Sequence, residues 1–194
     1  MPVRPNRPQR SKPKYKVILS DPAWRQSKGG KKSSRPNSSG GDLDYTTLSL
    51  DQITNIQRKS MELAEDDHIL FLWTIEKYLP EAEKMLKELS YKLHVRMIWN
   101  KVTGIPSAFT IRYGHEYLLY AYKGRMLPVD KKMQGKIHSV FTEQVKRHSQ
   151  KPTISYEIIE ALYPNVPRLE MYCRGTGRPK WDVWGYEAEN SIEL

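Results

Sequence analysis

The sequence contains very little cysteine and no long apolar run. Cys173 is the one cysteine among 194 residues, which excludes an internal disulfide and a cysteine-rich zinc site. The five histidines lack the spacing of metal ligands, so no metal is predicted. No run reaches transmembrane length, and the N-terminus lacks the apolar stretch of a signal peptide. We expect a soluble protein without a membrane partner, cytoplasmic or, if the source is eukaryotic, nuclear.

Acidic residues are scarce at the start of the chain. Residues 1–41 hold eleven lysines and arginines and one acid, Asp21, whereas the rest of the chain holds 21 basic and 21 acidic residues. The whole formal charge of +10 therefore flanks Asp21 on both sides. This asymmetry favours an approach to phosphate groups, and hence a nucleic-acid partner. For the first residues alone, a solvated tail is the alternative.

The apolar pattern alternates between strands and helices. Strands are expected at residues 15–20, 68–74, 92–99, 115–123, 137–141, 168–173 and 181–186. Helices are expected after the capping box Ser49-Leu50-Asp51-Gln52 and at residues 76–90 and 153–163. This order predicts an α/β fold with a mainly parallel, twisted sheet and helices on both faces.

Composition divides the chain into a tail and one domain. Residues 1–14 are rich in proline and arginine and are expected to form a basic, flexible tail, and residues 15–194 a single domain. Within it, residues 25–42 are rich in glycine, serine and lysine and lack apolar side chains. A long segment of this kind inside a compact domain is usually functional, so residues 25–44 are interpreted as a flexible active-site loop.

The stretch Ser20-Asp21-Pro22-Ala23-Trp24 follows the first expected strand. Asp and Pro are ordinary turn residues, and a plain turn is one interpretation. The other is a ligand site, because parallel sheets bind ligands beyond the carboxyl ends of their strands.

Further motifs decide between these interpretations. In order they are residues 45–49 (YTTLS), 70–73 (LFLW), 98–101 (IWNK), 148–152 (HSQKP) and 169–175 (LEMYCRG). Together with residues 20–24, this order resembles the adenine-N6 methyltransferases related to the catalytic subunit of the messenger-RNA adenosine methyltransferase, from about residue 15 to 187. The resemblance implies a Rossmann-like class I methyltransferase fold with the catalytic motif before the cofactor motifs. It also implies S-adenosyl-L-methionine as methyl donor.

The resemblance implies a catalytic role for four residues: Asp21, Pro22, Ala23 and Trp24. The family usually has a second proline where this chain has Ala23. The adenine amine is a poor nucleophile because its lone pair is delocalised into the ring. Asp21 and the carbonyl of Pro22 are expected to accept hydrogen bonds from that amine, and Trp24 to offer a stacking face to a base that has left the duplex.

The resemblance also implies two binding sets. Tyr45 matches the tyrosine that closes over the target base, and Lys151 matches the lysine near both substrate and cofactor. The predicted substrate-binding residues are Tyr45, Lys28, Lys31, Lys32, Arg35, Glu116 and Lys151. For Glu116 a surface ion pair is the alternative. The predicted cofactor-binding residues are Asp21, Ser149, Lys151, Pro152, Glu170, Arg174, Thr176, Tyr186 and Glu187.

Two details of the expected cofactor site stand out. Glu187 is expected to accept hydrogen bonds from the ribose hydroxyls. Relatives have an acid for the cofactor adenine upstream of the first strand, where this chain has Val3-Arg4.

Three functions follow from the resemblance. The first is methylation of the adenine N6 amine in DNA, the second the same reaction in RNA. The third is a non-catalytic nucleic-acid-binding subunit that supports a catalytic partner. A homodimer or a heterodimer with a related subunit is compatible with each.

Overall fold

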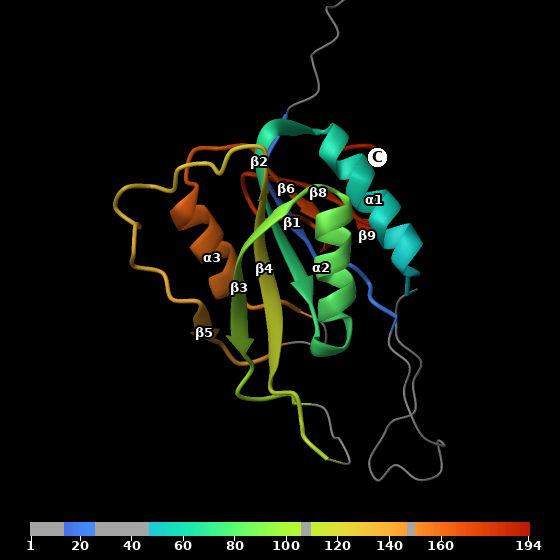
Figure 1. Ribbon diagram of the computed structural model, residues 1–194, viewed down its shortest axis with the longest axis vertical. Helices are drawn as coiled ribbons and strands as arrows, with labels where there is room; N and C mark the ends of the chain where they lie inside the picture. Colours follow the sequence, from blue (N-terminus) through green and yellow to red (C-terminus); the bar gives the residue numbers. More distant parts are fainter. Residues whose placement is uncertain (1–13, 26–46, 106–109, 147–149) are drawn as a thin grey trace, which may run out of the picture.

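The computed structural model describes residues 14–25, 47–105, 110–146 and 150–194. In this part of the chain a seven-stranded sheet is flanked by three α-helices (Figure 1). The strands of this sheet are β1 (Tyr15–Ser20), β2 (Ala64–Thr74), β3 (Lys92–Asn100), β4 (His115–Lys123), β5 (Val140–Thr142), β6 (Arg168–Met171) and β8 (Trp181–Trp184). A second, two-stranded sheet pairs β7 (Arg174–Gly175) with β9 (Glu187–Ala188). The helices are α1 (Leu50–Glu62), α2 (Leu79–Glu88), preceded by the 3₁₀ turn η2 (Glu76–Tyr78), and α3 (Thr153–Leu162).

The strand order is β5-β3-β4-β2-β1-β6-β8. β1 runs parallel to both of its neighbours, β6 to β8, and β3 to β5. β4 alone is antiparallel to its neighbours β2 and β3. The prediction of a mainly parallel sheet in an α/β fold is therefore confirmed. The reversed strand brings the start of β4 beside the carboxyl ends of β2 and β3.

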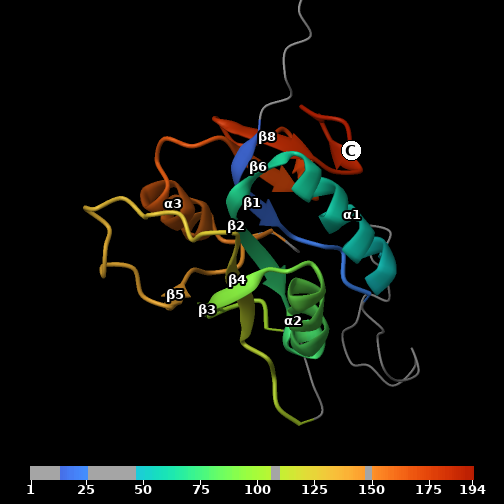
Figure 2. The same ribbon diagram turned by 45° about the horizontal axis from the view of Figure 1, so that its top comes forward.

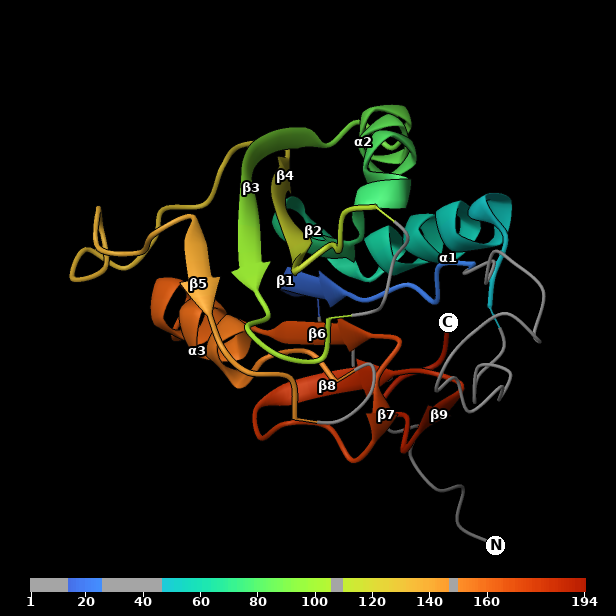
Figure 3. The ribbon, with the colours of Figure 1, turned by 90° about the horizontal axis from the view of Figure 1, so that it is seen from below.

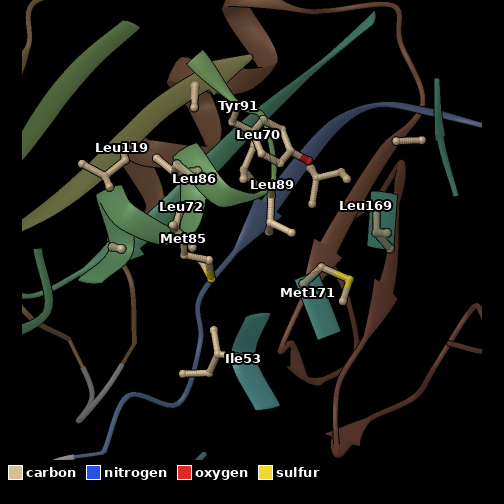
Figure 4. Packing of buried hydrophobic residues seen from close by; sticks show 14 of the residues in the cluster. Ile53, Leu70, Leu72, Met85, Leu86, Leu89, Tyr91, Leu119, Leu169 and Met171 are labelled. Atoms are coloured by element: carbon tan, nitrogen blue, oxygen red, sulfur yellow. The ribbon is translucent and has the colours of Figure 1, made fainter. Parts of the chain in front are cut away.

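The helices cover the two faces of the sheet. In Figures 2 and 3, α1 and α2 lie on one face and α3 on the other. Alternate residues of each strand point to opposite faces. Ile18 of β1 packs in the cluster that contains Ile53 of α1, whereas Val17 packs in the cluster that contains Ile159 of α3. Figure 4 shows the first cluster, in which Leu72 lies beside Met85 and Leu86 of α2, and Ile53 of α1 is a further member.

Side chains fix where the helices begin. Ser49 and Gln52 form the predicted capping box of α1. At α3 the residue before the helix is Pro152, which provides no capping group. Glu143 does so instead, because its two carboxylate oxygens accept the backbone N–H groups of Thr153 and Ile154 at 3.0 and 2.8 Å. This contact fixes the start of α3. It thereby also fixes the position of Lys151, the residue before Pro152.

The expected strand at 68–74 begins earlier, at Ala64, and two further departures from the predicted elements lie near the C-terminus. The expected strand at 168–173 ends at Met171, and Tyr172 has a left-handed φ of 66°. The expected strand at 181–186 is divided at Gly185 into β8 and β9. The backbone of Cys173 passes so close to Gly185 that a Cβ there would lie 2.1 Å from the Cys173 carbonyl oxygen. A glycine is required at this crossing.

Gly185→Ala is expected to lower the free energy of unfolding by about 1–3 kcal/mol, because the added methyl overlaps backbone atoms. Urea unfolding would measure this loss. Gly135→Ala is the control, since a Cβ there meets no atom within 4 Å and only the left-handed φ of 70° opposes it, for about 1 kcal/mol. A larger loss at Gly135 than at Gly185 would contradict the close approach.

No helix in the described ranges is long and apolar enough to cross a membrane.

Candidate active site

Asp21 lies at the carboxyl edge of the sheet, directly after the central strand β1. Its backbone N–H donates to the Met171 carbonyl at the end of β6 (3.4 Å). The next residues form a tight turn in which the Trp24 N–H donates to the Pro22 carbonyl at 2.8 Å. The Ala23 carbonyl in turn accepts from the Leu48 N–H at 3.0 Å. The motif is therefore held by its backbone, and the Pro22 oxygen retains a second lone pair.

Four charged side chains alternate in sign across this edge. Lys151 Nζ lies 2.8 Å from Asp21 Oδ1 and 3.5 Å from Glu116 Oε2. Lys101 Nζ lies 2.5 Å from the other oxygen of Glu116. The side chains of Lys101, Glu116 and Lys151 are 13–14% exposed, and that of Asp21 is 32% exposed. We call these four residues the charged row. They come from four segments: the turn after β1, the residue after β3, the start of β4 and the segment before α3.

The pKa values of the two carboxyls move in opposite directions. Burial raises the pKa of Asp21, and Lys151 acts against this rise. Burial also opposes ionisation of Glu116, but Lys151 and Lys101 together outweigh it and lower the pKa of Glu116. Glu116 is thus the firmly ionised member. Lys151 favours the ionised form of Asp21, which burial disfavours.

The two lysines of the charged row also contact tryptophan rings. Lys151 Nζ lies 5.5 Å from the centroid of the Trp73 ring, and Lys101 Nζ lies 5.3 Å from that of Trp99. Both rings are fully buried. Each cation therefore lies over an aromatic face as well as close to a carboxylate.

Lys101 was not among the predicted site residues. It follows β3, and the antiparallel pairing of β3 with β4 sets Trp99 opposite Glu116. This antiparallel pairing is the signal that would have linked Lys101 to Glu116.

The position of Trp24 does not match the base-stacking role predicted for it. It is 5% exposed, its Nε1 donates to the Trp73 carbonyl at 2.9 Å, and its ring stacks on Tyr78 at 5.4 Å between centroids. These contacts fix the motif to the end of β2. Trp24 therefore offers no open face on which a base could stack, because Tyr78 covers one face of its ring and the rest of the ring is buried. The sequence could not show this, since the partner Tyr78 is remote in the chain.

Glu170 lies on β6, beside β1, at the same edge. The hydroxyl of Tyr156 on α3 donates to Glu170 Oε1 at 2.7 Å. Burial raises the pKa of Glu170, and the negative charge of Asp21 adds to this rise. The two acids are therefore close enough to influence each other, as a shared site requires.

The remaining predicted cofactor residues gather on the small sheet of β7 and β9. Arg174 Nε lies 3.3 Å from Glu187 Oε2, and both side chains are about half exposed. Thr176 donates to Glu189, and Tyr186, 73% exposed, lies edge-on to Trp184. The charge of Arg174 also acts against the raised pKa of Asp21, which puts the small sheet on the Asp21 side.

Several predicted residues lie outside the described ranges. They are Lys28, Lys31, Lys32, Arg35, Tyr45 and Ser149. Their roles stay predictions, as does the division into a tail, one domain and an active-site loop.

The site also has the chemistry that S-adenosylmethionine would need. Three neighbouring parallel strands end beside a buried polar atom that has no hydrogen-bond partner within the described part of the chain: Trp73 Nε1, Ser20 Oγ and the Tyr172 hydroxyl. Carboxylates suit an ammonium group and ribose hydroxyls, and lysine or arginine suits a carboxylate. The residues present fit the methyl donor. Among the described residues, no group of three or more His, Cys, Asp or Glu is placed to hold a metal ion.

Comparison with known proteins identifies relatives of low identity. The chain is 26% identical over 203 residues to the Type II methyltransferase M.MunI of Mycoplasma sp, covering 96% of this chain and 84% of that protein. It is 24% identical over 184 residues to the human N(6)-adenosine-methyltransferase catalytic subunit METTL3, of which it spans only 28%. A Drosophila melanogaster N(6)-adenosine-methyltransferase MT-A70-like protein is 23% identical over 184 residues, with 91% of this chain and 27% of the relative covered.

The family profile extends over the strands and the edge that carry the site. The profile of MT-A70 matches residues 15–187, from the start of β1 to the first residue of β9. This range includes the charged row and the small sheet, and it shows that the chain belongs to the MT-A70 family.

Proposed function

We propose that this protein transfers a methyl group from S-adenosyl-L-methionine to the exocyclic N6 amine of adenine in nucleic acid, with DNA as the favoured polymer. The observation that carries the proposal is the pair Asp21–Lys151 at the carboxyl edge of β1, inside the region that matches MT-A70. An acceptor carboxylate held by a buried cation is what an amine nucleophile needs.

MT-A70 methyltransferases use S-adenosylmethionine as methyl donor. When bound, it supplies an electrophilic methyl group on a sulfonium. Glu170 and the Arg174–Glu187 pair would hold it, since they lie on the strands beside β1 and on the small sheet. In this arrangement the donor lies on the β6 side of Asp21, and the β4 side, with Glu116, remains for the base.

Asp21 activates the amine by accepting a hydrogen bond from it. The accepted bond localises the nitrogen lone pair, and the free lone pair of the Pro22 carbonyl offers a second acceptor. Lys151 favours the ionised form of Asp21 in surroundings that raise the pKa of Asp21. Correct positioning alone supplies roughly 7–11 kcal/mol in well-oriented reactions. The backbone bonds of the Pro22 turn and the packing of Trp24 provide that rigidity.

Glu116 serves the base rather than the donor. It is ionised beside two lysines, one of which, Lys151, also pairs with Asp21. A carboxylate held in this way accepts hydrogen bonds from N–H groups of a base edge. The lysines also provide positive charge near the phosphates that flank that base.

DNA is favoured over RNA because the chain spans most of the type II methyltransferase but about a quarter of METTL3. The basic charge of +10 suits either polymer. The assembled Asp21, Lys151 and Glu116 argue against a subunit without activity. Self-association, or pairing with a related subunit, is compatible with this proposal.

The proposal is tested by methyl transfer from isotope-labelled S-adenosylmethionine to matched DNA and RNA oligonucleotides, single- and double-stranded. The modified nucleosides would be identified by mass spectrometry. We expect labelled N6-methyl-2′-deoxyadenosine from DNA. Label in RNA alone would favour the second function. Nucleic-acid binding without transfer to any of the four substrates would favour the non-catalytic subunit.

A further inference from the structure

The hydroxyl of Tyr172 is a buried polar group without a hydrogen-bond partner within the described residues. Other buried tyrosine hydroxyls in the described ranges are paired. Tyr15 donates to Asp182 at 2.7 Å, Tyr156 to Glu170 at 2.7 Å, and Tyr91 bonds the ring of His68 at 2.6 Å. An unpaired buried hydroxyl typically costs about 1–3 kcal/mol. The Tyr172 hydroxyl therefore lowers the stability of the unliganded fold, whereas the hydroxyls of Tyr15, Tyr156 and Tyr91 do not.

The backbone holds Tyr172 in an unusual conformation. Its φ of 66° lies in the left-handed region, which a bulky residue seldom adopts. The next residue fixes this bend, because the Cys173 N–H donates to the Trp184 carbonyl at 3.0 Å. The Tyr172 ring also lies edge-on to Trp184, with 5.8 Å between centroids. Strained residues of this kind are concentrated at ligand sites, where the surrounding structure holds them in place.

Tyr172 lies between the two parts of the candidate site. It follows β6 directly, so it lies between the turn after β1 that carries Asp21 and the segment after β8 that carries Tyr186. Burial raises the pKa of the Tyr172 hydroxyl, and Tyr186 and Asp21 add to the rise. The group therefore stays a neutral phenol that can both donate and accept a hydrogen bond.

We propose that the Tyr172 hydroxyl binds the nucleoside part of S-adenosylmethionine, and that this contact supplies its missing hydrogen bond. The inference rests on the proposed function, since it concerns the donor side of the same site. The amino-acid end of the donor is charged and matches the charged groups Lys151 and Glu170. A neutral phenol beside Tyr186 and the Arg174–Glu187 pair matches the uncharged hydroxyls of a ribose.

The test is Tyr172→Phe, which removes the hydroxyl and keeps the ring. Calorimetric titration with S-adenosylhomocysteine, the product form, should show about tenfold weaker binding, the usual effect of one lost hydrogen bond. Thermal unfolding of the unliganded variant should occur at the wild-type temperature or above it, because the variant loses a buried polar group that had no partner. Adenosine as the probe should show the same tenfold loss.

Tyr91→Phe is the matched control. Its hydroxyl has a partner in the unliganded protein, so this variant should unfold at a lower temperature and bind S-adenosylhomocysteine as wild type does. Wild-type affinity in Tyr172→Phe would overturn the inference while leaving the proposed function intact. A loss with S-adenosylhomocysteine but not with adenosine would overturn the assignment to the nucleoside. If the wild-type protein binds neither probe, the proposed function fails, and the inference fails with it.

Discussion

Asp21→Asn should lower the rate of methyl transfer by about 10²–10³-fold, the usual effect of removing one preorganised polar group from an active site. The amide has nearly the shape of the carboxylate, but it is a weaker acceptor and carries no charge. It can no longer localise the lone pair of the amine. Single-turnover transfer at saturating S-adenosylmethionine would measure the rate of the chemical step.

Binding of S-adenosylhomocysteine separates a chemical role of Asp21 from a structural one. Affinity within a few-fold of wild type is expected, because the donor is held mainly by the β6 side and the small sheet. Asp67→Asn is the matched control. It breaks a 2.9 Å ion pair with Arg125 near the amino end of β2, far along the strand from the site, and should leave transfer unchanged. Transfer by Asp21→Asn within tenfold of wild type would refute the role given to Asp21.

Lys151→Met should lower transfer at neutral pH by about a hundredfold and move the acidic limb of the pH–rate profile to higher pH. Lys151 acts against the effect of burial on the pKa of Asp21. Without the cation, the pKa of Asp21 rises further, so a higher pH is needed to ionise the carboxyl. Activity should therefore recover in part as the pH is raised.

The same substitution should also reduce stability. It leaves Asp21 and Glu116 as two carboxylates at one edge without the cation between them. Removing one partner of a fully buried ion pair lowers the free energy of unfolding by about 3–5 kcal/mol. Because Asp21 is a third exposed, about 2 kcal/mol is expected here. Lys151→Arg should restore part of the rate and the position of the acidic limb.

Arg96→Met is the control for the loss of a cation. Its ion pair with Glu83 lies on β3 with half of the arginine side chain exposed, so both rate and pH profile should remain as in wild type. If Lys151→Met lowers the rate without moving the acidic limb, Lys151 does not set the ionisation of Asp21.

The sequence predicted the elements that rest on local periodicity. Residues 15–20 and 115–123 form strands with the expected bounds, and the capping box at Ser49 begins α1. The carboxyl end of β1 was predicted because a continuous apolar run followed by Asp-Pro marks it. These features depend on neighbouring residues, which a sequence displays directly.

Features that depend on remote partners were not predicted. The partnership of Lys101 with Glu116 requires the antiparallel pairing of β3 with β4, and the burial of Trp24 requires Tyr78 and Trp73. The hydroxyl of Tyr172, which has no partner among the described residues, likewise depends on a left-handed residue at the end of β6, where the pattern favoured a continuous strand. Sequence spacing carries no information on these contacts.

The central claim is that the site methylates the N6 amine of adenine, and one substitution in the substrate tests it most directly. Single-turnover transfer of a labelled methyl group would be measured on a DNA duplex and on the same duplex with hypoxanthine at every adenine. Hypoxanthine keeps the purine ring but has an oxygen in place of the N6 amine. We predict labelled N6-methyladenine from the first duplex and no label in the second. Equal labelling of both duplexes would contradict the proposed reaction.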